Sequence, residues 1–131
     1  MCPIGTIHTN ATNIPKFWAI SDVEGELVID EELMDGLKDI ESGQRIMVIF
    51  YFHKSSNFTR ESLTQYPRGN TNRPKKGVFS IRSPIRPNPI GLSILMVTDI
   101  KDNVMRVKGL DMYDGTPVLD IKPLSNHLND Y

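Results

Sequence analysis

Hydrophobic and polar residues alternate in short runs along most of this chain, a pattern typical of β-strands. The strongest run covers residues 45–53, whose Ile, Val, Phe and Tyr side chains predict a strand buried on both faces. The Asp102-Asn103 dipeptide is typical of a hairpin turn between two further runs. Besides 45–53, strands are predicted at residues 4–9, 26–29, 77–82, 92–100, 104–110 and 117–121, followed by a polar tail.

One helix is predicted, with Asp30 as its N-cap, Glu31 and Glu32 in its first turn and a stop at Gly43. Its apolar residues at helical spacing are Leu33, Leu37 and Ile40. Residues 54–76 lack periodicity and exceed the roughly 12–15 residues usual for a loop within a domain, which favours a functional or mobile segment.

The connections between the six or seven predicted strands are too short for repeated βαβ crossovers. We therefore expect a mainly β protein: a small antiparallel-rich β-barrel with one short helix and a long basic loop. The length of 131 residues fits a single domain over residues 1–131, and a hydrophobic content of 39% predicts a packed core.

The chain offers no sign of secretion or membrane insertion. Its one cysteine, Cys2, has no partner for an internal disulfide, and the residues after Met1 do not form a cationic and then apolar leader. The longest apolar run, residues 46–52, is far shorter than the ~18 residues of a membrane span. We expect a cytoplasmic protein without membrane contact.

Positive charge is concentrated in one segment. Residues 54–86 contain eight basic residues and one acidic residue, Glu61, a net charge of +7, so the rest of the chain carries −8 of the overall −1. Such a segment favours binding of a polyanion, because neutralising phosphates releases counterions. The alternative is a solvated charged loop with no partner.

Residues 77–91 form the densest motif, Gly-Val-Phe-Ser-Ile-Arg-Ser-Pro-Ile-Arg-Pro-Asn-Pro-Ile-Gly. Three prolines fix φ and remove backbone donors, so Arg82 and Arg86 lie on a backbone that cannot easily relax. This pattern is equally consistent with a ligand-binding loop and with a proline-stiffened corner between two strands.

The motif, continued to Ser93, resembles the signature of the TsaA-like family of tRNA methyltransferases. Two more segments match in order, residues 4–7 (Ile-Gly-Thr-Ile) and residues 111–123 (Asp-Met-Tyr-Asp-Gly-Thr-Pro-Val-Leu-Asp-Ile-Lys-Pro). The resemblance spans essentially the whole chain, although the C-terminal domain of longer bacterial members has no counterpart.

This resemblance implies a compact β-barrel that binds S-adenosylmethionine, usually as a homodimer. It also implies methylation of N6 of a threonylcarbamoyl-modified adenosine next to the tRNA anticodon. No Gly-x-Gly-x-x-Gly follows a predicted strand, so a Rossmann-type cofactor site is disfavoured. No metal site is predicted.

The resemblance also implies a set of cofactor-binding residues. Arg82 would hold the cofactor carboxylate with a two-pronged guanidinium, and Leu92 would cover the adenine. Asp111 or Asp114 would accept hydrogen bonds from the ribose or the ammonium group. The full set is Pro15, Lys16, Phe17, His53, Lys54, Arg82, Leu92, Asp111, Met112, Tyr113 and Asp114.

Two positions depart from the family pattern. The family's Pro-Arg-Gln is Pro15-Lys16-Phe17 here, which keeps a charge but exchanges the guanidinium fork for aromatic surface next to Trp18. A bacterial member has Gln at the position of Lys54. We expect a locally altered cofactor pocket.

Contacts to tRNA are expected from the basic segment and the proline motif. A base splayed from the anticodon loop would stack on Tyr66, Phe79 or Tyr113. No catalytic residue is assigned, and His53, Asp111 and Asp114 are candidates for a general base. The predicted RNA-binding residues are Arg60, Arg68, Arg73, Lys75, Lys76, Arg86 and Asn88.

Two other functions remain open at this point. A catalytically silent nucleotide- or RNA-binding barrel would keep the basic loop and lack methyl transfer. A methyltransferase for another substrate would share the fold, because function resides in sites rather than folds.

Overall fold

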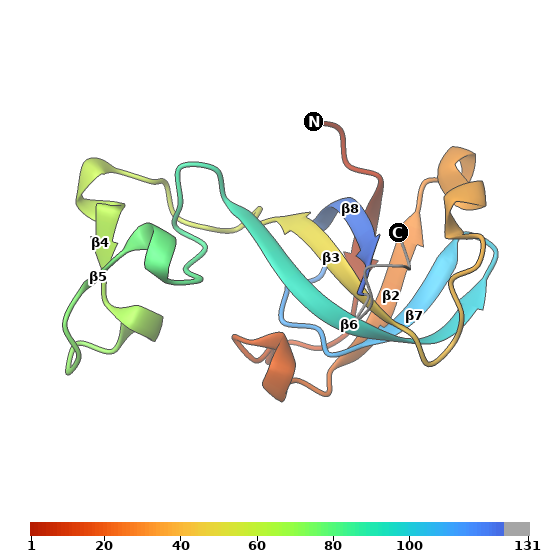
Figure 1. Cartoon of the computed structure of the whole chain (residues 1–131), viewed down its shortest axis with the longest axis horizontal. Helices are drawn as coiled ribbons and strands as arrows, with labels where there is room; N and C mark the ends of the chain where they lie inside the picture. The colour runs from red at the N-terminus through yellow and green to blue at the C-terminus, as the bar shows by residue number, and fades with distance from the viewer. Residues whose placement is uncertain (125–131) are drawn as a thin grey trace.

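Six antiparallel strands close into a barrel in the order β1-β2-β7-β6-β3-β8 (Figure 1). The computed structural model describes residues 1–124, and the polar tail expected beyond them lies outside this range. The predicted β-barrel is therefore confirmed. Its strands are β1 (Gly5–His8), β2 (Glu24–Ile29), β3 (Arg45–Tyr51), β6 (Ile90–Lys101), β7 (Val104–Lys108) and β8 (Pro117–Pro123).

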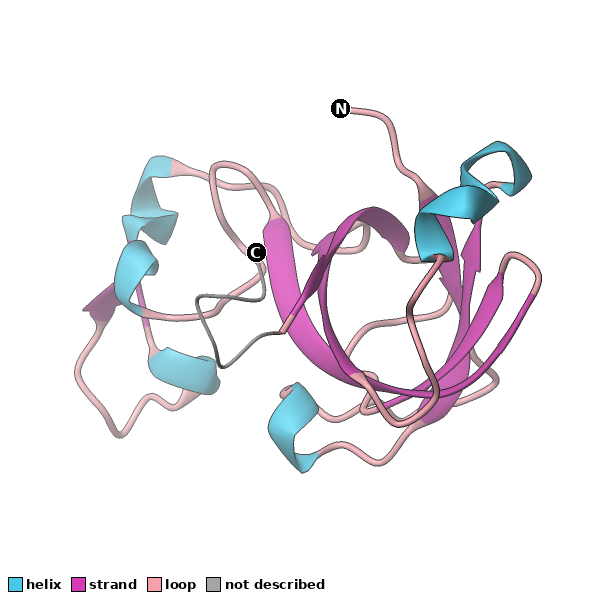
Figure 2. Ribbon diagram, turned by 45° about the vertical axis from the view of Figure 1, so that its right-hand side comes forward, coloured by secondary structure: helices cyan, strands magenta, loops and turns pink. Residues whose placement is uncertain are grey.

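Alternation of side chains along each strand fills the barrel interior. On β3, Ile46, Val48 and Phe50 point inward and are buried, while Met47 and Ile49 are only half-buried. The prediction of a strand buried on both faces was therefore wrong, because no layer of helices from residues 1–124 covers the outer face of this barrel (Figure 2). The fully buried core includes Ile7, Leu27, Val48, Leu95, Val97, Met105, Val107 and Val118.

The predicted hairpin turn at Asp102-Asn103 is confirmed. Asp102 has a φ of 54°, and the Asn103 side chain donates a 2.7 Å hydrogen bond to the carbonyl of Ile29 on the neighbouring strand β2. The turn joins the long strand β6 to β7, so the far end of β6 pairs with β7, while its first half pairs with β3.

The predicted helix is present but shorter, and it has 3-10 geometry. It spans Glu31–Leu37 (η2), Asp30 forms no side-chain cap, and the helix ends six residues before Gly43. Only Leu37 of its residues is buried, and Gly36 lowers its helical propensity. Little packing is therefore available to extend the helix into an α-helix.

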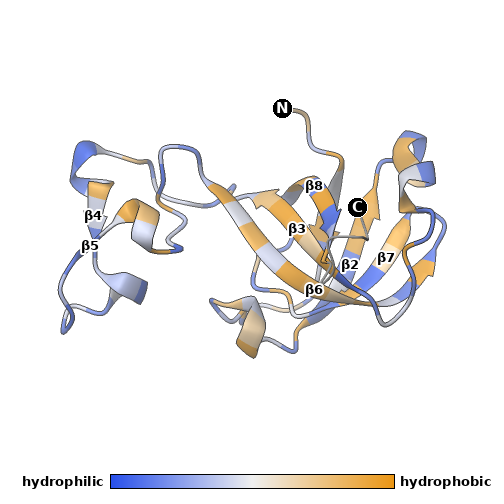
Figure 3. Cartoon of the chain, viewed as in Figure 1, coloured by the Kyte–Doolittle hydropathy of each residue, from blue (hydrophilic) through white to orange (hydrophobic). Residues whose placement is uncertain are grey.

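Residues 54–89, called the arm from here on, project away from the barrel in both views (Figures 1 and 2). The strand predicted at residues 77–82 was wrong, because the chain forms only a two-residue pairing there before a helical turn. Figure 3 shows that hydrophobic residues concentrate on the barrel strands rather than on the arm. The arm elements are η3 (Arg60–Leu63), β4 (Thr64–Gln65), η4 (Pro67–Gly69), β5 (Lys76–Gly77) and η5 (Val78–Ser80).

Residues 1–124 include no helix with the length and apolar character needed to cross a bilayer. The cytoplasmic location predicted from the sequence stays a prediction.

Close packing at Gly91, the last residue of the motif at residues 77–91, generates a stability prediction. A Cβ at Gly91 would overlap the buried Phe50 ring and lie 2.7 Å from the Phe52 ring. We expect Gly91→Ala to lower the free energy of unfolding by about 1–3 kcal/mol in urea denaturation. Gly36→Ala is the matched control, because a Cβ there meets no atom within 4 Å. Equal stability of the two variants would contradict this packing.

Candidate functional site

The carboxylate of Asp111 joins three segments at the end of the barrel from which the arm emerges. Its Oδ1 accepts a 2.6 Å hydrogen bond from the Ser93 hydroxyl on β6, and its Oδ2 accepts a 3.0 Å hydrogen bond from the backbone N–H of Trp18. Gly109, with φ of 104°, turns the chain after β7 so that Asp111 reaches this position. Trp18 opens the 3-10 helix Trp18–Ile20 (η1).

Burial raises the pKa of Asp111 above the ordinary aspartate value of 3.8. The hydrogen bonds from Ser93 and from the backbone of Trp18 lower the pKa and offset part of that effect, as does the nearby positive charge of Arg82. Desolvation is the largest of these effects, so the ionised carboxylate is less favourable here than in water. Both oxygens already accept hydrogen bonds from the protein, which supports a structural role for Asp111.

Arg82 lies between the arm and the barrel. Its Nη2 donates to the carbonyl of Leu92, and its guanidinium carbon is 5.6 Å from the centroid of the Phe17 ring. Leu92 is 37% exposed and offers apolar surface beside this guanidinium. The structure therefore brings Phe17, Arg82, Leu92 and Asp111 together, as the sequence predicted for a single site.

His53 and Lys54 follow β3 and lie next to the turn that precedes β8. The Lys54 ammonium is 5.3 Å from the centroid of the Tyr113 ring, and His53 Nδ1 is 3.5 Å from the Thr116 hydroxyl. That hydroxyl donates its proton to the carbonyl of Tyr113 at 2.6 Å, so it can only accept from His53. This favours a proton on Nδ1 and leaves Nε2 free to accept one.

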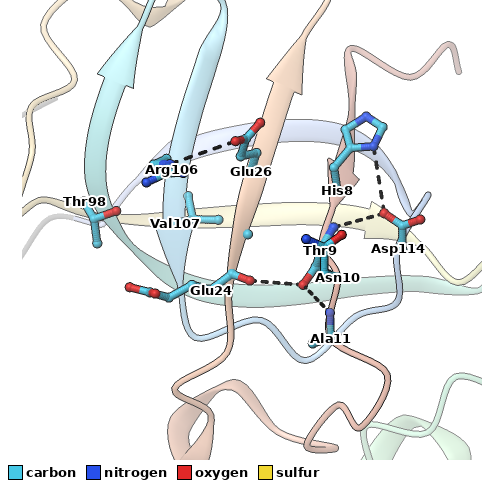
Figure 4. Close-up of a pocket in the computed structure, with 11 residues that line it drawn as sticks. His8, Thr9, Asn10, Ala11, Glu24, Glu26, Thr98, Arg106, Val107 and Asp114 are labelled. Atoms are coloured by element: carbon cyan, nitrogen blue, oxygen red, sulfur yellow. Dashed lines mark hydrogen bonds and ion pairs between the residues drawn. The ribbon is translucent and has the colours of Figure 1, made fainter.

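Asp114 and Met112 do not join the cluster around Arg82. Met112 is buried in the barrel core. Asp114 accepts a 3.0 Å hydrogen bond from the backbone N–H of Thr9 and lies 3.9 Å from His8 Nδ1, at a polar cavity of about 600 Å³ (Figure 4). Glu24, Glu26 and Arg106 line the same cavity. Within residues 1–124, no hydrogen bond or ion pair connects Asp114 with Arg82.

Pro15 and Lys16 lead into Phe17, with Pro15 half-buried and Lys16 exposed. The Phe17 ring packs on Trp18 at a centroid distance of 5.1 Å. The indole N–H of Trp18 is buried and has no hydrogen-bond partner within residues 1–124. An unsatisfied donor beside Phe17 and Arg82 is consistent with a polar ligand at this end of the barrel.

Arg86 differs from the other predicted RNA-binding residues. Its Nη1 donates to the carbonyls of Ile81 and Ser83, at 2.9 and 3.2 Å, and its side chain is half-buried. It therefore fixes the proline turn from within, while the side chain of Asn88 is exposed. The remaining predicted residues are exposed on the arm: Arg60, Arg68, Arg73, Lys75 and Lys76.

The exposed arm cations have no carboxylate partner within 4 Å in the part of the chain that the structure describes. The ammonium of Lys75 lies 5.2 Å from the centroid of the Tyr66 ring, and the guanidinium of Arg68 lies 5.9 Å from that of Phe17. Their charge is therefore not neutralised by neighbouring side chains, and aromatic surface lies beside it.

Sequence reasoning missed Ser93 and Gln65. Ser93 is fully buried and takes an inward position on β6, between Gly91 and Leu95. A polar residue at an inward position was the available signal, because such groups need a partner. Gln65 Nε2 donates to the carbonyls of Ser62 and Ile85 and joins the two halves of the arm, and nothing in its sequence context indicated this.

Comparison with known proteins gives consistent matches. The family model of the tRNA-methyltransferase O N-terminal domain matches residues 4–130. A protein of Pyrococcus abyssi named a probable S-adenosyl-L-methionine-binding protein is 39% identical over 92% of this chain and 65% of its own length. The tRNA (adenine(37)-N6)-methyltransferase of Mus musculus is 41% identical over 72% of this chain and 21% of its own length.

The crystal structure of TrmO from Pseudomonas aeruginosa superposes with a TM-score of 0.69 at 26% identity, covering 99% of this chain and 57% of that chain. This chain thus spans under two thirds of the length of these relatives.

The raised pKa of Asp111 generates a pH prediction. Because the folded state holds this proton more tightly than the unfolded state, the ionisation of Asp111 lowers stability as pH rises from about 4 through the raised value. We expect the free energy of unfolding of the wild type to fall over this range relative to that of Asp111→Asn. Urea denaturation of both proteins between about pH 3.5 and 7 measures the difference.

Ser93→Ala provides a second test of the same carboxylate. Removing the donor that lowers the pKa of Asp111 shifts the loss of stability to higher pH. A stability difference between wild type and Asp111→Asn that stays constant with pH would rule out the raised pKa.

Proposed function

Because this chain belongs to the family of the tRNA-methyltransferase O N-terminal domain, as its motif predicted, we propose that it is an S-adenosylmethionine-dependent tRNA methyltransferase. Its substrate is N6 of threonylcarbamoyladenosine next to the anticodon. The observation that carries the proposal is the position of Arg82, between Phe17 and Leu92 at the base of an arm of unneutralised cations.

The cofactor fits the residues at the base of the arm. Arg82 keeps guanidinium N–H groups beyond the one that bonds Leu92, and these hold the cofactor carboxylate. The exposed surface of Leu92 covers the adenine. Asp111 positions Trp18 and thereby Phe17, and does not bind the cofactor directly.

When bound, S-adenosylmethionine supplies an electrophilic methyl group. The N6 nitrogen of the urea-like group is a poor nucleophile until it loses its proton, so the reaction needs a base. His53 suits this role, because its exposed ring has a free Nε2 and the absent side chain of Gly115 leaves space beside that atom. The arm binds phosphates of the anticodon stem, which sets the orientation of the base.

The homodimer implied by the resemblance belongs to the same proposal. Apolar side chains exposed on the arm and at its base support it, since a second copy would cover them: Phe79 is 78% exposed and Tyr113 54%. Sedimentation equilibrium of the purified chain measures the oligomeric state.

Methyl transfer is tested with purified protein, S-adenosylmethionine and tRNA carrying threonylcarbamoyladenosine. We expect mass spectrometry of the digested nucleosides to show one added methyl group, and calorimetry to show cofactor binding. Arg82→Lys keeps the positive charge but loses the guanidinium that can donate two parallel hydrogen bonds to a carboxylate. We therefore expect the dissociation constant of the cofactor to rise by roughly tenfold or more.

Each negative outcome selects an alternative. RNA binding without cofactor binding indicates a catalytically silent RNA-binding barrel. Cofactor binding without tRNA methylation indicates a methyltransferase for another substrate, and methylation of tRNA that lacks the threonylcarbamoyl group removes that requirement.

The phosphate contacts of the arm predict a salt dependence. The logarithm of the tRNA association constant falls linearly with the logarithm of salt concentration, and each lost phosphate contact lowers the slope by roughly 0.7–0.9. We therefore expect Arg73→Ala and Lys76→Ala each to reduce the slope by about that amount. Lys101→Ala is the matched control, because Lys101 ends β6 far from the arm. A tRNA affinity insensitive to salt would refute the arm as the phosphate-binding surface.

A further inference from the structure

The arm is attached to the barrel by few contacts. Its strands β4 and β5 pair only with each other among the described residues. Close to the barrel, Lys54 lies over Tyr113 and Arg82 donates to Leu92. Farther out, the contact is made by Arg68, whose guanidinium reaches the Phe17 ring.

Local backbone geometry brings Arg68 back toward the barrel. Arg68 has φ of 53° and Gly69 has φ of 69°, so two consecutive residues adopt the left-handed conformation after Pro67. This conformation is unfavourable for a non-glycine residue and is retained where surrounding contacts support it. The contact with Phe17 is the one cation–π interaction of Arg68 in residues 1–124.

Phe17 receives two guanidinium groups from separate parts of the arm. Arg68 and Arg82 lie 5.9 and 5.6 Å from the centroid of its ring, within the range of cation–π attraction. The ring itself is supported from the barrel side, because it packs on Trp18, whose backbone N–H is bound by Asp111. A fixed ring therefore holds two long side chains that are otherwise exposed.

We propose that Phe17 is a positioning residue that couples RNA binding by the arm to cofactor binding at the barrel, an inference that rests on the proposed function. A cofactor that fixes Arg82 also fixes its packing on Phe17, and the same ring holds Arg68 and the outer arm. RNA then meets an arm whose orientation is already set, so less conformational freedom is lost on binding. The coupling is positive and reciprocal.

The test measures RNA affinity of the full chain with and without S-adenosylhomocysteine, which binds without transferring a methyl group. The probe is a fluorescent tRNA anticodon stem-loop. We expect the ligand to raise RNA affinity by about two- to fivefold, the effect of one exposed cation–π contact. Calorimetry in the presence of the stem-loop gives the same factor for S-adenosylhomocysteine.

Variants of Phe17 distinguish coupling from simple loss of packing. In Phe17→Ala and Phe17→Leu, we expect the ratio of RNA affinities with and without S-adenosylhomocysteine to fall to about one, because neither side chain has an aromatic face. Leucine keeps apolar volume, so its effect separates the loss of the ring from the loss of packing. Phe17→Tyr retains the factor. Ile20→Ala is the matched control at the end of the 3-10 helix that follows Phe17. The Ile20 side chain is 74% exposed, and its 3.2 Å hydrogen bond to the Phe17 carbonyl comes from the backbone, so the substitution keeps it.

A ligand-free measurement tests the docking of the arm directly. Trypsin cleaves at the exposed arm residues Arg60, Arg68, Lys75 and Lys76, and we expect faster cleavage there in Phe17→Ala than in Ile20→Ala. Equal cleavage rates overturn the inference, as does a coupling factor that Phe17→Ala leaves unchanged.

The inference and the proposed function fail in distinguishable ways. If both ligands bind the wild type but do so independently, the coupling is wrong and the proposed function stands. If S-adenosylhomocysteine or the stem-loop does not bind, the proposed function is wrong and the coupling is overturned with it.

Discussion

The half-buried carboxylate of Asp111 is the interaction on which the arrangement of the site depends. Three segments far apart in the chain meet there: the segment after β7, strand β6 through Ser93, and η1 through Trp18. Burying a carboxylate is costly unless its oxygens accept hydrogen bonds, and both oxygens of Asp111 do. The position of Phe17, and through it the packing of Arg82, follows from this junction.

The barrel and the arm are stabilised in different ways. The barrel has a continuous apolar core, whereas Val78 is the one buried apolar residue of the arm. Side-chain hydrogen bonds shape the arm internally: Gln65 joins its two halves, and Arg86 holds the proline turn. The orientation of the arm therefore depends on a few side-chain contacts with the barrel, whereas the barrel strands are held by their common core.

The barrel was predictable because side-chain alternation and hairpin turns are local signals, and the positions of all six barrel strands agreed within about two residues at both ends. The 3-10 turns of the arm could not be predicted from the sequence, because contacts between distant residues, such as that of Gln65 with Ile85, determine them. The family resemblance implied one site for Arg82, Leu92 and Asp111, and the structure brings these three residues close together. The neighbours Met112 and Asp114 face other directions because the chain is irregular between Gly109 and Gly115, both at positive φ, and its side-chain directions depend on tertiary contacts.

Counting charge along the sequence overstates how many cations are available to a ligand. Arg86 donates to two backbone carbonyls and Arg82 to one, so both are held in fixed positions at the proline turn. Lys54, Arg68 and Lys75 rest on aromatic rings and keep their charge while losing some freedom. The arm thus runs from fixed cations at its base to freer ones at its tip. Under the proposed function this gradient would separate two tasks, since fixed groups would define the orientation of the reacting base while freer cations would supply affinity for phosphates.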